Sequence, residues 1–257
     1  MIFDTSAYLG ALSYAQPRSG MWHLPPSGIT NAAELISLMD RFGINRAALG
    51  SLRSIYYDHT EGNREVLHAV NQYSSRFVGI AIVYPHYDHS LQEFEDLLVK
   101  QGMKGLQLEP LYHNFQLDDG TADPFVELSI KRQVPVFLPL CITMNWNFPR
   151  VEIKYVRELI DRYPEATYVV GMLSYEIEGV LRLMKKYDNV MAETSGLQLM
   201  QGIERLVREV GANRILYASG MPIQMAGPAL AKIQEADISE EDKDLILAQN
   251  AEKLLGK

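Results

Sequence analysis

Cysteine, basic clusters and long apolar runs are all scarce in this 257-residue chain. Cys141 is the single cysteine, which excludes an internal disulfide. No run of Lys or Arg exceeds two residues, and 24 basic against 32 acidic residues give a formal charge of −8. Because such a surface repels phosphate backbones, we expect no nucleic-acid partner.

The sequence predicts neither a membrane segment nor a signal peptide. The longest strongly apolar run, 78–83, is far shorter than the roughly 20 residues of a membrane helix. Asp4 interrupts the first residues, where a signal peptide has a basic and then an apolar segment. We therefore expect no membrane partner and a reducing, cytoplasmic compartment. The composition is compatible with a homo-oligomer.

Short apolar segments alternate with helical patterns along the whole chain. Eight of them read as strands, at 1–3, 46–49, 78–83, 105–108, 136–138, 167–170, 190–192 and 215–218. Such alternation predicts parallel βα units. The alternative is an open doubly wound sheet, but no Gly-rich phosphate turn follows the first strand, and eight even units favour closure. We predict an α/β fold, a (β/α)8 TIM barrel, as a single domain over 1–257.

Several helices carry start signals. Asn31 precedes Glu34, Ser90 and Glu93 have the spacing of a capping box, and Pro124 follows Asp123 at the start of another helix. Residues 239–242 have the composition of a cap for a last helix at 243–255. These signals fix the expected element boundaries to within a few residues.

Long connections follow three of the expected strands, at 5–29, 109–122 and 141–149. In a TIM barrel the connections after the strands form the mouth that holds the active site. Loops of this length are usually functional, although a decorative surface excursion is the alternative for 5–29.

Two glutamates stand directly after strands of the expected barrel. Glu109 follows the fourth strand and Glu193 follows the seventh, so both are candidates for an acid and a base, one of them with a raised pKa. The alternative is a salt bridge or a solvated rim position. His113 lies four residues after Glu109 and is a further catalytic candidate. Cys141 follows the fifth strand, where a buried, unreactive thiol is favoured over a nucleophile.

Other residues on the same connections could bind a ligand. Arg53 and Arg18 could hold a carboxylate, whereas aromatic side chains could offer flat faces. The candidate substrate-binding residues are Tyr8, Trp22, Arg53, His86, Trp146 and Tyr175. A solvated arginine or histidine is the alternative for each charged position.

Four features occur in a characteristic order. They are Asp4 after an apolar strand, Tyr163-Pro164 before strand six, the segment 214–222 around strand eight, and a closing helix with Asn250-Ala251 and Leu254-Leu255. In this order the chain resembles the amidohydrolase-2, or aminocarboxymuconate-semialdehyde-decarboxylase-like, group. The resemblance implies a TIM barrel and hydrolase or decarboxylase chemistry with a divalent metal.

The metal ligands that the resemblance implies are not found at the matching positions. The group binds metal through His-x-His after strand one, single histidines after strands five and six, and an Asp after strand eight. The matching positions hold Ser6 and Tyr8, Pro139, Met172 and Gly220. Asp4 is retained beside the first pair, as a fourth catalytic candidate or a support of the strand-one turn.

A bound metal lowers the pKa of water from about 15.7 to roughly 7. This lowers the free energy of forming hydroxide by on the order of 12 kcal/mol. No residue that remains at these positions replaces this contribution. We therefore predict no metal and no cofactor. The alternative is a relocated metal site built from Asp4, His86, Glu109, His113 and Glu193.

Three functions follow from these observations. The first is a divergent amidohydrolase-like barrel without metal that acts on a small organic acid or amide, by hydrolysis of a C–N bond or by decarboxylation. The second is a non-catalytic pseudoenzyme that binds a small molecule or a partner protein. The third is a hydrolase with the relocated metal. The expected partner is a small-molecule ligand or substrate, with a partner protein as the alternative in the second case.

Overall fold

The strands of the computed structural model form one parallel barrel wall. The structure describes residues 1–10, 31–141, 150–173 and 176–256. Its strands are β1 (Phe3–Leu9), β2 (Arg46–Ser51), β3 (Phe77–Gly79), β4 (Ala81–Ile82), β5 (Leu106–Gln107), β6 (Val136–Pro139), β7 (Tyr168–Gly171), β8 (Val190–Glu193) and β9 (Ile215–Leu216). They pair in parallel in the order β1-β2-β3 and β4-β5-β6-β7-β8-β9.

Backbone hydrogen bonds join these two runs into a closed barrel. The Ile80 N–H donates to the Leu49 carbonyl at 3.0 Å, so β3 and β4 are two halves of one interrupted barrel strand. The Thr5 N–H donates to the Tyr217 carbonyl at 2.9 Å, which joins β1 to the segment of β9. The predicted TIM barrel is confirmed. The first strand is longer than predicted, because residues 5–9 continue β1 instead of opening the loop.

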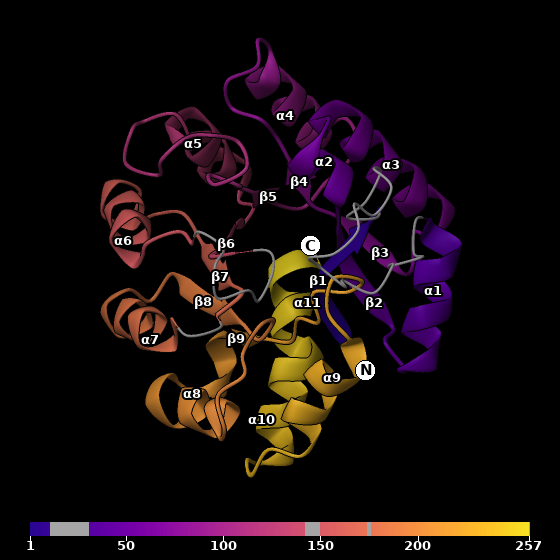
Figure 1. Ribbon diagram of the computed structural model, residues 1–257, viewed down its shortest axis with the longest axis vertical. Coiled ribbons are helices and arrows are strands. Elements are labelled where there is room, and N and C mark those ends of the chain that lie inside the picture. Colours follow the sequence, from indigo (N-terminus) through magenta and orange to yellow (C-terminus); the bar gives the residue numbers. More distant parts are fainter. Residues whose placement is uncertain (11–30, 142–149, 174–175, 257) are drawn as a thin grey trace, which may run out of the picture.

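Helices surround the strands in a ring (Figure 1). In chain order they are α1 (Ala32–Arg41), α2 (Leu52–Tyr56), α3 (His59–Gln72), α4 (Ser90–Val99), α5 (Asp123–Arg132), α6 (Ile153–Arg162), α7 (Ile177–Lys186), α8 (Gly202–Val210), η1 (Ala212–Arg214), α9 (Ala226–Gln234), α10 (Glu240–Asp244), the π-helical turn η2 (Leu245–Gln249) and α11 (Asn250–Leu255). No helix in the described ranges is long and apolar enough to cross a membrane.

The core has two main parts. The larger one packs the outer faces of the strands against the helices. A second cluster fills the barrel interior toward the amino ends of the strands, where Phe3, Phe137 and Leu216 meet Ala251 and Leu255 of α11. The last helix therefore closes the bottom of the barrel and leaves the opposite end as the mouth.

The capping predictions were partly right. Asn31 caps α1 by accepting from the Glu34 N–H, and Ser239 caps α10 by accepting from the Asp242 N–H. The capping box at Ser90 was wrong, because Ser90 is already the first helical residue and His89 precedes it in a left-handed conformation. Glu93 instead accepts hydrogen bonds from His59 and Thr60. The last helix, predicted over 243–255, is helical throughout that range, and the π-helical turn η2 lies between α10 and α11.

Candidate active site

A line of hydrogen bonds crosses the barrel from β1 and ends at Glu109. The Ser6 hydroxyl donates to the Tyr8 hydroxyl at 3.4 Å, which donates to Gln107 Oε1 at 3.4 Å. Gln107 Nε2 donates to Glu109 Oε1 at 2.6 Å. Gln107 and Glu109 are two residues apart, so strand alternation places both on the inner side. We call these four residues the β1–β5 relay.

Glu193 closes the opposite side of the mouth at the end of β8. Its Oε1 accepts a hydrogen bond from the Ser195 hydroxyl, and Ser195 Oγ accepts from the Met172 N–H at 3.2 Å. The Glu193 side chain lies over β7 at Gly171, where an added Cβ would overlap its carboxyl and come within 2.7 Å of its Cγ. A glycine in β7 therefore makes room for this carboxyl inside the barrel.

Asp4 holds β1 against the segment that follows β9. Its Oδ1 accepts from the Ser6 N–H at 3.1 Å and the Ser219 N–H at 2.9 Å, and its Oδ2 accepts from the Ser219 hydroxyl at 2.5 Å. The side chain is fully buried. These bonds lie where the barrel closes, so the structure gives Asp4 a part in closing it.

The three carboxyls share one electrostatic feature. Burial raises the pKa of Glu109 to about 8, that of Glu193 to about 7 and that of Asp4 to about 6. The nearby Asp4 charge adds to the rise at Glu193, whereas the hydrogen bonds from Gln107, Ser195 and Ser219 oppose these shifts. No Lys, Arg or His of the described ranges acts on any of the three. The carboxyls are therefore poised near neutral pH.

Two half-buried tyrosines lie beside the relay. The rings of Tyr56 and Tyr112 meet edge to face with centroids 4.9 Å apart, and both pack against the cluster that contains Tyr8. Burial, with a smaller effect of the Glu109 charge, raises the pKa of both hydroxyls. This side of the mouth is thus aromatic and uncharged.

A small pocket lies between the relay and Glu193. It measures about 10 Å³ and is lined by Thr5, Ser6, Tyr8, Gln107, Phe137, Leu138, Pro139, Val169, Gly171 and Glu193. That volume is enough for roughly one water molecule. We call it the floor pocket.

Gln224 occupies the side of the mouth near β7 and β9. Its Nε2 donates to Met172 Sδ at 2.9 Å, and its Oε1 accepts from the Gly196 N–H at 3.2 Å. It also packs on Gly220, where a Cβ would lie 3.3 Å from Gln224 Cδ. An uncharged amide and a thioether therefore stand where the family resemblance implies a histidine and an aspartate.

The predicted histidines do not join the carboxyls. His113 is buried between two backbone carbonyls, with Nδ1 3.1 Å from the Val83 oxygen and Nε2 3.1 Å from the Ser54 oxygen. Burial lowers its pKa to about 4. His86 is exposed and lies 3.1 Å from the Asn114 carbonyl. His113 thus joins α2 to the segment that follows β4, and its predicted catalytic role stays a prediction.

The remaining candidates have varied placements. Tyr8 belongs to the relay, whereas Arg53 pairs with Glu65 at 2.8 Å and so already has a carboxylate partner within the protein. Cys141 is buried, which raises its pKa, as expected of an unreactive thiol. Trp22, Trp146 and Tyr175, together with Arg18, lie outside the described residues.

The relay and its neighbours include residues that sequence reasoning missed. They are Gln107, Ser195, Tyr56, Ser219 and Gln224. The one local signal for Gln107 and Ser195 is their spacing of two residues from Glu109 and Glu193, which places each pair on one face of a strand. This signal was not part of the prediction from the sequence.

The potential metal-binding side chains of the described residues lie apart from one another. Within the described part of the chain, no three His, Cys, Asp or Glu side chains come together in a way that could hold a metal ion. Asp4 already accepts three hydrogen bonds. These donors therefore do not fit the metal that the family resemblance implies, nor the alternative site built on His86 and His113.

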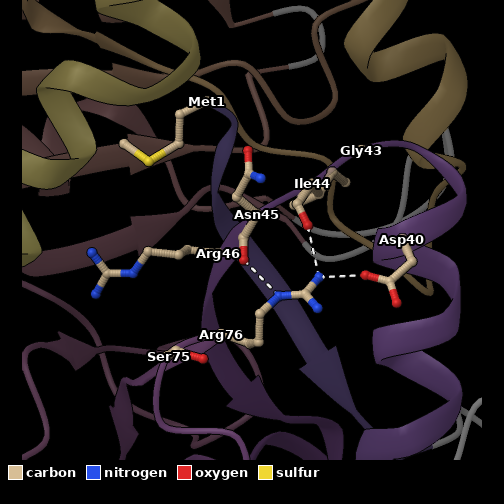
Figure 2. Close-up of a pocket in the computed structure, with 8 residues that line it drawn as sticks. All are labelled: Met1, Asp40, Gly43, Ile44, Asn45, Arg46, Ser75 and Arg76. Carbon is tan, nitrogen blue, oxygen red and sulfur yellow. Dashed lines mark hydrogen bonds and ion pairs between the residues drawn. The ribbon is translucent and has the colours of Figure 1, made fainter.

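A larger pocket lies at the other end of the barrel (Figure 2). It measures about 500 Å³ and is lined by Asp40, by residues that precede β1, β2 and β3, and by Arg46 at the start of β2. Its Arg76 donates to Asp40 and to the carbonyls of Ile44 and Asn45, and Arg46 pairs with Glu252. Because both guanidinium groups have partners within the protein, this pocket is a poor candidate for an anion site.

Comparisons with known proteins agree with the barrel. No curated protein sequence matches the chain. Over the full length, similar solved structures include 5-carboxyvanillate decarboxylase from Novosphingobium aromaticivorans, with 18% identity, 100% and 96% coverage of the two chains and a TM-score of 0.80. The 2,6-dihydroxybenzoate decarboxylase from Rhizobium has 16% identity, 99% and 98% coverage and a TM-score of 0.80. A putative amidohydrolase from Staphylococcus aureus has 18% identity, 100% and 99% coverage and a TM-score of 0.78.

At these identities the structural matches show the fold. The profile of the amidohydrolase family matches residues 34–257, which is most of the chain and includes both mouth glutamates. This chain is therefore a TIM-barrel member of the amidohydrolase family.

Proposed function

We propose that this protein acts on a small organic acid or amide at the barrel mouth, with Glu109 and Glu193 as its proton-transfer groups and no metal held by the described residues. One observation carries the proposal. Two buried carboxyls stand in one mouth, each fixed by a single side-chain donor, and no cationic side chain of the described ranges acts on either of them.

Proton transfer is most effective when the pKa of the acting group lies near the working pH. Burial raises the pKa of Glu109 to about 8, so at pH 7 its carboxyl is mostly protonated and suited to donate a proton. The pKa of Glu193 is raised to about 7, so its carboxyl is ionised in part of the molecules and suited to accept a proton. The donors from Gln107 and Ser195 fix the orientation of each carboxyl, which is what a proton-transfer group requires.

The relatives support the size and nature of the ligand. One structure of 5-carboxyvanillate decarboxylase contains manganese and 4-hydroxy-3-methoxy-5-nitrobenzoic acid, and 2,6-dihydroxybenzoate decarboxylase was solved with 2,6-dihydroxybenzoate. The tyrosines at the mouth of this chain offer comparable aromatic surroundings. No step is assigned to a metal here, because the described donors do not fit one.

Isosteric replacement of each glutamate tests the proposal. Glu109→Gln and Glu193→Gln keep the shape of the side chain but remove its ability to exchange a proton. Turnover of a panel of small aromatic acids and amides should fall by about 10²–10⁴-fold in each. Glu240→Gln, which changes an exposed residue of α10, serves as the matched control. Equal activity in all three variants would show that Glu109 and Glu193 have structural roles and transfer no proton.

A further inference from the structure

The segment that follows β8 turns sharply beside Glu193. The Leu197 N–H donates to the Thr194 carbonyl at 3.2 Å, and Gly196 has a φ of 69°. A hydrogen bond between the first and fourth residues, with a left-handed glycine in third place, is typical of a type II turn. Ser195, the second residue of this turn, donates from its hydroxyl to Glu193. The placement of the turn therefore decides whether the Ser195 hydroxyl reaches the carboxyl.

The central peptide group of this turn has a partner at each end. The Ser195 carbonyl accepts from the Leu173 N–H at 3.1 Å, and the Gly196 N–H donates to Gln224 Oε1 at 3.2 Å. Gly196 also packs against the backbone of Met172, where an added Cβ would lie 3.3 Å from the Met172 Cα. The hydrogen bond of the turn itself joins only its first and last residues. Gln224 therefore supplies the acceptor that the central N–H needs.

The amide of Gln224 is oriented by two contacts. Gly196 offers an N–H, so the amide oxygen faces it, and the amide nitrogen donates to Met172 Sδ at 2.9 Å. Met172 has a φ of 54°, which is uncommon for a residue with a side chain. Its own N–H donates to Ser195 Oγ at 3.2 Å. Gln224 thus contacts both the residue that follows Ser195 and the residue that donates to the Ser195 hydroxyl.

Lys232 of α9 holds the two ends of the same turn. Its Nζ donates to the Leu197 carbonyl at 2.6 Å and to the Thr194 carbonyl at 3.4 Å. These bonds do not involve the central peptide group. A change at Gln224 therefore leaves the ends of the turn anchored, and we expect a Gln224 variant to fold.

We propose that Gln224 is a positioning residue, which acts through Ser195 to fix the Glu193 carboxyl in the barrel mouth. For its effect on turnover, the inference rests on the proposed function, in which Glu193 transfers a proton. The effect on the carboxyl itself needs no substrate. Because Gln224 acts through another residue, its replacement should lower kcat by about tenfold and change KM little.

Gln224→Met tests the inference on the full-length protein, because it keeps the length of the side chain and removes both polar groups. Carbon NMR of protein labelled at the glutamate carboxyl carbons measures the pKa of Glu193, whose signal is the one lost in Glu193→Gln. Burial raises this pKa, and the hydrogen bond from Ser195 opposes the rise. Ser195→Ala should therefore raise the pKa further by about 1–2 units, the usual effect of losing a hydrogen bond to a charged group. Gln224→Met should raise it by at least about 0.5 unit.

Two further variants complete the comparison. Gln234→Met makes the same change at an exposed position of α9 and should leave the pKa of Glu193 unchanged. Met172→Leu removes the sulfur acceptor at similar volume, so its rise should be smaller than that of Gln224→Met. Among the described residues, the titratable groups coupled to Glu193 are Asp4 and Tyr8 of β1. None of these substitutions changes either group.

An unchanged pKa of Glu193 in Gln224→Met or in Ser195→Ala would overturn the inference, and a lower Tm alone would show that Gln224 only stabilises the fold. If Gln224→Met does not fold, Met172→Leu decides, and an unchanged pKa in that variant overturns the inference. If Gln224→Met raises the pKa while Glu193→Gln keeps full turnover, the positioning role stands and the proposed function fails. If Glu193→Gln abolishes turnover while Gln224→Met alters neither the pKa nor kcat, the proposed function stands and this inference fails.

Discussion

Glu193 and Gly171 lie in close contact at the mouth. The Glu193 carboxyl occupies space that any Cβ at position 171 would overlap. The observed placement of the Glu193 side chain therefore requires a residue without a Cβ at position 171, which links a residue type in one strand to the placement of an ionisable group in the next.

Gly171→Ala should lower the free energy of unfolding by about 1–3 kcal/mol, the usual cost of overpacking a buried position. Denaturant titration measures this loss. In a double-mutant cycle with Glu193→Ala, the cost of the alanine should shrink, because the truncated side chain vacates the space. A cost that is the same in both backgrounds would show that the contact does not decide the fit.

The buried carboxyls also predict how stability depends on pH. Their folded-state pKa values of about 8 for Glu109 and about 7 for Glu193 lie above the ordinary 4.5. The folded state therefore binds these protons more tightly than the unfolded state. The resulting stabilisation is complete below about pH 4.5 and is lost as the pH rises through 7 and 8.

Between pH 6.5 and 8, the free energy of unfolding should therefore fall in the unmodified protein. Each unit of pKa shift corresponds to about 1.4 kcal/mol over its full range. Glu109→Gln should reduce this slope, since glutamine does not titrate, and Glu240→Gln should preserve it. Urea titrations at several pH values provide the comparison, and an unchanged slope in Glu109→Gln would contradict the raised pKa.

At the scale of elements, the interrupted strand of β3 and β4 depends on a side chain of α3. Asn63 is buried and donates from Nδ2 to the Ile82 carbonyl at 2.9 Å, while its Oδ1 accepts from the Ile82 N–H at 3.1 Å. The amide thus satisfies both polar groups of one residue of β4. It takes the place of a strand partner where the ladder is broken.

Asn63→Ala should destabilise the protein by about 2–4 kcal/mol, because it leaves two buried backbone groups without partners. Asn71→Ala makes the same change on an exposed position of the same helix and should cost little. Thermal or denaturant unfolding compares the two. A similar small loss in both variants would show that Ile82 finds other partners.

At the scale of the whole molecule, the described donors predict the metal content. No three His, Cys, Asp or Glu side chains of the described residues converge on one point, and catalytic zinc normally has three protein ligands. Protein purified without added metal should contain far less than one equivalent of zinc, iron or manganese, and its activity should survive a chelator. Elemental analysis with assays before and after chelation measures both. Stoichiometric metal whose removal abolishes activity, and whose return restores it, would refute the prediction.

The barrel itself could be predicted from the sequence because its signals are local. Apolar segments that alternate with amphipathic helices, and the caps at Asn31 and Ser239, depend on residues a few positions apart. The same local order places Glu109 and Glu193 just after, or at the end of, barrel strands. The limits of β1 and of the last helix were less predictable, because closure against β9 and the turn η2 are set by packing.

The surroundings of each site residue were decided only by the tertiary structure. Asp4 meets Ser219, which is 215 positions away, and His113 meets the carbonyl of Ser54, 59 positions away. No local pattern encodes such contacts, so a position after a barrel strand could not show that His113 lies between two backbone carbonyls. The sequence determined by itself which strand ends carry ionisable groups. The closed barrel decided which of them have no cationic partner among the described residues, because burial and distance between remote segments exist only once the chain has folded.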